Sequence, residues 1–255
     1  MNRSLTNKIL PWLAPVLGIL GMAAMWAQFA FGTDARGLLI PFHPTTMIVW
    51  LLTIVMTASL LLILRNMEDT AGYLRLFPDS RAAALGTLCA AIGILATAVE
   101  SLTAMNEPVR IISGLLKIVA GVALIYLAWC RWKNVRGSFL AWAAVTAYML
   151  LRVMFEYRSW STQPELMQFL FPLLASVLMV LAMYHRTAFC VKLGSRSQFL
   201  FFSQFGAFCC LLALPAVPAP FYAGMAIWAL TDRCSLKVVK AKAAETPDNG
   251  PEETP

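Results

Sequence analysis

The chain has 255 residues, of which 60% are hydrophobic and only 13% are charged, and its formal net charge is +7. Soluble domains usually carry about 25% charged residues, so this composition excludes an ordinary soluble fold. The long apolar stretches lack the alternation of membrane-spanning β-strands and favour helices, so the sequence predicts an all-α, polytopic transmembrane helical bundle.

The first half of the chain contains four predicted spans, each close to the roughly 20 apolar residues that a bilayer core requires. They are Leu10–Phe31, Thr45–Leu64, Ala82–Met105 and Ile111–Cys130. The N-terminus resembles a signal peptide, but its apolar run exceeds the usual core of about 7–15 residues, so a retained first helix is expected. The loop at 66–81 is either a short interfacial helix or an ordinary loop on the head groups.

The second half begins with two further spans, at Phe139–Tyr157 and Leu166–Tyr184, and ends in an apolar region too long for one helix. That region, Phe199–Thr231, contains three central prolines, which break helices. We therefore predict two short spans, at Phe199–Leu214 and Val217–Leu230. Their flanking arginines, Arg196 and Arg233, are expected to snorkel to the membrane surface.

The distribution of basic residues predicts the orientation. Eight spans with both termini in the cytoplasm place most of the 20 Lys and Arg residues inside, whereas the seven-span alternative places the basic tail outside. We therefore expect a multi-pass protein of the cell membrane, with one transmembrane domain at 1–236 and a disordered cytoplasmic tail at 237–255. Its basic loops favour contact with anionic lipid head groups over nucleic-acid binding.

Two ionisable residues lie within predicted spans, where charge is costly and therefore a functional candidate. Glu100 and Lys117 are equidistant from the turn at Glu107–Pro108, so an antiparallel hairpin places them at equal depth. We expect an ion pair between them. It would serve either as a structural link between the two helices or as part of a polar site open to the outside.

A second pair, Arg152 and Glu156, lies one helical turn apart near the outer end of the fifth span, where opposite charges can pair. The pair is either a boundary salt bridge or a partner of Glu100 and Lys117 in one outward-facing cluster. Such a cluster would suit a small zwitterionic or anionic solute.

The remaining polar residues do not form a recognisable metal, cofactor or catalytic site. Six cysteines show no metal-ligand spacing, and the two histidines lie on opposite predicted sides of the membrane, so neither a metal nor a cofactor is expected. The sequence contains none of the protease, hydrolase or nucleotide-binding motifs that we sought, which disfavours an enzyme without excluding one. Gln28, Ser203 and Gln204 are expected to form interhelical hydrogen bonds, and small residues such as Gly86 and Ala90 to permit close helix packing.

Two function classes follow from these residues. The first is a small-solute transporter or membrane receptor that binds a polar solute among Glu100, Lys117, Arg152 and Glu156. The second is a non-transporting structural or regulatory subunit, whose charges are structural and whose basic cytoplasmic face binds a protein partner that the sequence does not identify.

Overall fold

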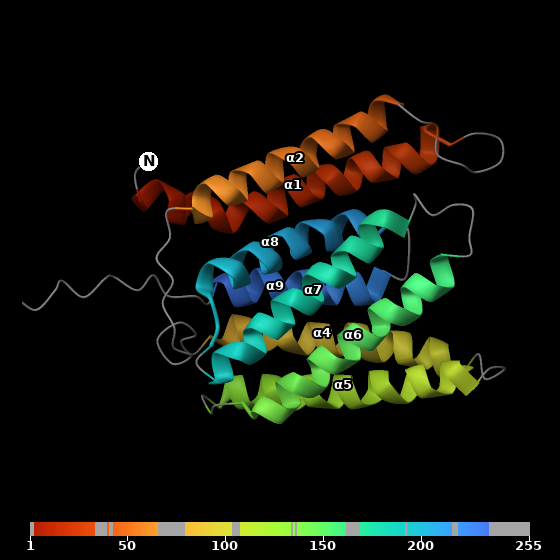
Figure 1. The fold of residues 1–255 in the computed structure, drawn as a ribbon, viewed down its shortest axis with the longest axis vertical. Coiled ribbons are helices and arrows are strands. Elements are labelled where there is room, and N and C mark those ends of the chain that lie inside the picture. Colours follow the sequence, from red (N-terminus) through yellow and green to blue (C-terminus); the bar gives the residue numbers. More distant parts are fainter. Residues whose placement is uncertain are drawn as a thin grey trace, which may run out of the picture.

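The computed structural model describes residues 3–33, 40, 43–65, 80–103, 108–133, 135, 137–161, 169–191, 193–215 and 219–234. Within these ranges eight α-helices form the fold (Figure 1): α1 (Arg3–Phe31), α2 (Pro44–Leu64), α4 (Arg81–Thr103), α5 (Pro108–Trp132), α6 (Phe139–Trp160), α7 (Leu170–Ala188), α8 (Arg196–Ala213) and α9 (Ala219–Cys234). A 3-10 turn, η2 (Phe189–Val191), follows α7. The predicted all-α class is confirmed. The tail and nearly all of the loop at 66–81 lie outside the described residues.

Six of these helices, α1, α2 and α4 to α7, are long and apolar enough to cross a membrane, so the chain is a multi-pass membrane protein. The predicted helices at the C-terminal end are also present, as α8 and α9, with 18 and 16 residues. At 1.5 Å per residue they measure about 27 and 24 Å, slightly less than a bilayer core of about 30 Å. Eight spans and cytoplasmic termini therefore remain predictions.

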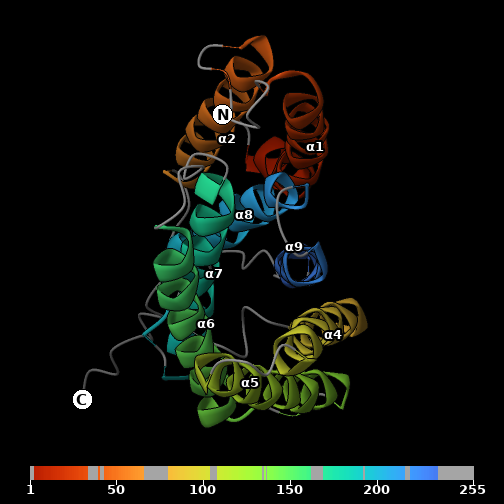
Figure 2. The ribbon, with the colours of Figure 1, turned by 90° about the vertical axis from the view of Figure 1, so that its right-hand side faces the viewer.

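Helices α4 to α9 form a closed ring. Each packs against the next in chain order, and α9 returns to pack against α4 (Figure 2). The hairpin of α1 and α2 lies outside this ring and reaches it mainly through α8, with α1 making the larger contact. The fold therefore consists of a six-helix ring and a peripheral hairpin.

The ring has two ends that differ in charge. We call the end where α5, α7 and α9 finish the basic end, because it carries Arg131, Arg186, Arg196 and Arg233. It lies at the left of Figure 1, on the same side as the N-terminus. The opposite end, where α4, α6 and α8 finish, is the distal end. The basic end corresponds to the side that the sequence predicts to be cytoplasmic.

The ring closes between α4 and α9 through direct contact of their backbones. A Cβ atom added at Gly224 would lie 2.7 Å from the carbonyl oxygen of Cys89, and one added at Gly93 would lie 2.4 Å from that of Pro220. Gly86 lies similarly close to the Thr231 side chain. The predicted role of small residues in close helix packing is confirmed.

Candidate functional site: two charged clusters inside the helical ring

The predicted pair of Arg152 and Glu156 on α6 is present as an ion pair, but it does not lie at an exposed boundary. The two side chains are only 7% and 15% exposed. The Arg152 guanidinium lies 3.3 Å from the centre of the Phe221 ring on α9 and 5.7 Å from that of Tyr222. Because α6 turns this face toward α9, the boundary salt bridge is the wrong interpretation, and the pair belongs to the interior of the ring.

A chain of hydroxyl groups extends the pair to α7 and α9. The Ser176 hydroxyl on α7 donates to Oε2 of Glu156 over 2.8 Å and lies 3.3 Å from the Tyr222 hydroxyl. Tyr222 also reaches the carbonyl oxygen of Pro172, at 3.4 Å. Ser176 and Tyr222 are fully buried. Sequence reasoning missed both, because an isolated serine and tyrosine in apolar runs carry no spacing signal.

Lys117 lies in the distal half of α5, but it does not contact the predicted partner. Its Nζ donates to the carbonyl oxygen of Thr97, at 3.1 Å, and to the hydroxyl of Ser101, both on α4. Glu100 is exposed, and among the described residues no ion pair joins it to Lys117. The expected ion pair is therefore wrong, because the α4 face toward Lys117 carries Thr97 and Ser101.

The four predicted residues nevertheless all lie in the distal halves of three consecutive helices. Glu100 lies on α4, Lys117 on α5, and Arg152 and Glu156 on α6, and each of these helices packs against the next. We call Lys117, Arg152, Glu156, Ser176 and Tyr222 the distal cluster; Glu100 lies outside it, on the exposed surface of α4. Among the four predicted residues the structure shows one direct contact, the ion pair of Arg152 and Glu156.

A second charged cluster, at the basic end, was not predicted. Asp232 in the last turn of α9 is fully buried and forms ion pairs with Arg131 of α5 and Arg186 of α7, the latter with Nε at 3.2 Å from Oδ2. The guanidinium of Arg186, also fully buried, lies 4.9 Å from the centre of the Trp142 ring on α6. These residues form the basic-end cluster, which joins four of the six ring helices.

Little in the sequence indicated this second cluster. Its arginines satisfied the positive-inside rule, which left no reason to place them in the interior, and Asp232 stood at a span boundary. The prediction that Arg196 and Arg233 snorkel to the membrane surface is wrong, because the two residues are only 6% and 5% exposed. They are packed inside the protein and do not snorkel outward.

An apolar layer separates the two clusters. On α5, Lys117 and Arg131 lie fourteen residues apart on one face, which corresponds to about 21 Å along the helix. Buried apolar side chains occupy the intervening positions of the ring helices, namely Leu124, Val145, Met149, Met225 and Trp228. The ring interior is therefore charged at both ends and apolar in the middle.

No three His, Cys, Asp or Glu side chains converge on a possible metal site in the part of the chain that the structure describes. Comparisons of the chain with protein-family models, with curated proteins and with solved structures found no match. The functional assignment therefore depends on the geometry of the two clusters.

Proposed function

We propose that this multi-pass membrane protein binds a small zwitterionic or anionic solute at the distal cluster, as a transporter or a membrane receptor. The observation that carries the proposal is the buried Arg152–Glu156 pair on α6, which packs against α5, the helix that carries Lys117. Charges inside a membrane protein are costly and usually face a substrate pathway or a ligand, and insertion scales give about 2.5–3.5 kcal/mol for one at the helix centre.

The balance of charge supports the choice of solute. The distal cluster contains two cationic groups, Lys117 and Arg152, and one carboxylate, Glu156, whereas Glu100 is exposed. A solute carboxylate would complement this surplus, and Glu156 could receive the ammonium group of a zwitterion. The Nε of Arg152 is buried without a hydrogen-bond partner among the described residues, which leaves a donor available to an anion.

The alternative is a non-transporting subunit that binds a protein partner through its basic face. The contacts of Lys117 with Thr97 and Ser101 favour it, because they satisfy the ammonium group within the protein and link α4 to α5. In that case the distal cluster would hold the ring together and would have no affinity for solutes.

Ligand-induced stabilisation distinguishes the two functions. Full-length protein in lipid nanodiscs would be melted with a panel of zwitterionic, anionic, cationic and neutral small solutes, since a ligand that binds only the folded state raises the melting temperature. We expect stabilisation by a zwitterion or an anion. Lys117→Met should weaken the binding of that solute by about tenfold or more, because hydrogen bonds to charged groups contribute about 1.5–3 kcal/mol.

Two controls isolate the distal cluster. Lys133→Met removes an exposed cation at the basic end, and Glu100→Gln removes the exposed carboxylate beside the cluster, so both should retain the ligand response. If no class of solute stabilises the wild type, the proposal fails and the structural alternative is favoured. An equal loss of response in Lys133→Met would show that the solute binds elsewhere.

A further inference from the structure

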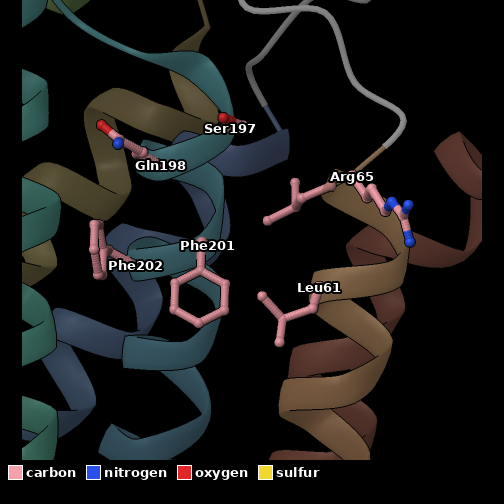
Figure 3. Close-up of a pocket in the computed structure, with 7 residues that line it drawn as sticks. Leu61, Arg65, Ser197, Gln198, Phe201 and Phe202 are labelled. Carbon is pink, nitrogen blue, oxygen red and sulfur yellow. The ribbon is translucent and has the colours of Figure 1, made fainter.

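A groove runs between α2 and α8 at the basic end. It has a volume of about 410 Å³ and is open to the surface of the protein (Figure 3). Its lining comes from the last turns of α2 and the first two turns of α8: Leu61, Leu64, Arg65, Ser197, Gln198, Phe201 and Phe202. The groove exists because α1 packs along α8, whereas α2 touches α8 only over a short stretch.

We propose that this groove binds an anionic phospholipid, with one acyl chain along its apolar walls and the phosphate at its basic end. Leu61 of α2 and Phe201 of α8 face each other across it (Figure 3). Phe202 stacks on His185 of α7, with ring centres 5.4 Å apart, which fixes the back wall. The exposed leucines of α2 show that this hairpin presents apolar surface to the bilayer, so lipid is the molecule that surrounds the groove.

The order of residues along the groove matches the order of groups in a phospholipid. The polar residues are at the helix ends, where Arg65 caps α2 and Ser197 and Gln198 belong to the first turn of α8. The aromatic and leucine side chains lie deeper along both helices. A head group at the membrane surface and a chain directed toward the bilayer core would therefore meet complementary groups in turn.

The charge at the mouth of the groove favours an anionic head group over a zwitterionic one. Arg65 is exposed, and its side chain extends from the end of α2 outside the groove (Figure 3). Its long side chain can turn back over the mouth to meet a phosphate. Arginine and phosphate form strong charge-assisted hydrogen bonds.

The test is lipid retention by the full-length protein, measured by native mass spectrometry. Phosphatidylglycerol and phosphatidylcholine with identical acyl chains would compete for the protein. We expect preferential retention of one phosphatidylglycerol molecule. Arg65→Gln should weaken that binding about fivefold, the contribution of one basic residue close to an anionic membrane surface. Leu61→Trp, which fills the groove and keeps the charge, should also weaken it.

Matched variants separate a groove from general surface charge. Lys133→Gln removes an exposed cation at the same end of the protein, and Leu62→Trp adds the same bulk to an exposed α2 position outside the groove, so both should retain the lipid. Equal retention of the two lipids, or equal losses in Lys133→Gln and Arg65→Gln, would overturn the proposal. Unchanged binding in Leu61→Trp would place the lipid elsewhere and would also overturn it.

Discussion

The two hairpins differ in a way that their hydropathy does not suggest. The hairpin of α1 and α2 lies at the periphery of the protein, whereas that of α8 and α9 belongs to the helical ring. Of the six helices that are long and apolar enough to span a membrane, α2 is the most apolar, yet large side chains such as Leu51 and Ile54 are about 60% exposed on it. In contrast, α8 falls outside that group and contains Ser203 and Gln204, yet most of its side chains are buried.

The difference shows what hydrophobicity measures in a membrane protein. Lipid tails are as apolar as leucine side chains, so burying a leucine between two helices gains little over leaving it in lipid. Close packing and polar contacts determine which helices occupy the interior, and these are made by small and polar residues. For α2 and α8, hydropathy is therefore a measure of contact with lipid rather than of burial in the protein.

The largest effect is expected where α9 meets α4 backbone to backbone. Gly224→Leu would insert a side chain where even a Cβ atom lies 2.7 Å from the carbonyl oxygen of Cys89. Overpacking a well-packed core costs about 1–3 kcal/mol and more where backbone must move. We expect loss of the folded protein in fluorescence-detected size-exclusion chromatography, whereas Ala58→Leu on the exposed face of α2 should leave the elution profile unchanged. Normal folding of Gly224→Leu would contradict the central position of α9.

Asp232→Asn in the basic-end cluster is expected to lower stability strongly while the protein still folds. The change leaves Arg131 and Arg186 without the carboxylate that both contact. Removing one member of a buried ion pair costs about 3–5 kcal/mol. We expect a large drop in melting temperature in nanodiscs, and almost none for Glu100→Gln, which removes an exposed carboxylate. Similar melting temperatures for the two variants would show that Asp232 is not buried as an ion-paired group.

The smallest effect contrasts the same substitution in the two hairpins. Both amide atoms of Gln204 are buried without a hydrogen-bond partner among the described residues, whereas Gln28 donates to Thr46 over 3.0 Å and links α1 to α2. Gln204→Leu should raise the melting temperature by a few degrees, because an unsatisfied buried polar group costs about 1–3 kcal/mol. Gln28→Leu should lower it slightly, since interhelical hydrogen bonds contribute about 0.6 kcal/mol on average.

Melting-temperature shifts of equal size and the same sign in Gln204→Leu and Gln28→Leu would contradict this contrast.

The prediction that Gln28, Ser203 and Gln204 form interhelical hydrogen bonds is confirmed only for Gln28. Ser203 donates within its own helix, to the carbonyl oxygen of Leu200. Gln204 differs because the described residues around it supply no partner, which a single sequence cannot indicate.

Local information was sufficient to place the helices. The apolar runs and the clustered prolines located the eight helices to within four residues, except that α1 begins at Arg3, seven residues before the predicted start. Helix formation in lipid depends on the length of the apolar run and on which residues interrupt it. The one-turn spacing of Arg152 and Glu156 likewise predicted their ion pair correctly, since residues four apart on a helix face the same way.

The partners of the remaining charges depend on which helices become neighbours and how each one is rotated. Lys117 and Glu100 do lie on adjacent helices, but a rotation that no periodicity reveals directs the lysine to Thr97 and Ser101. Asp232 meets Arg131 and Arg186 from helices far apart in the chain, so no spacing rule could join them. Composition and periodicity describe each helix against lipid, whereas the charged interior arises only when six helices close into a ring.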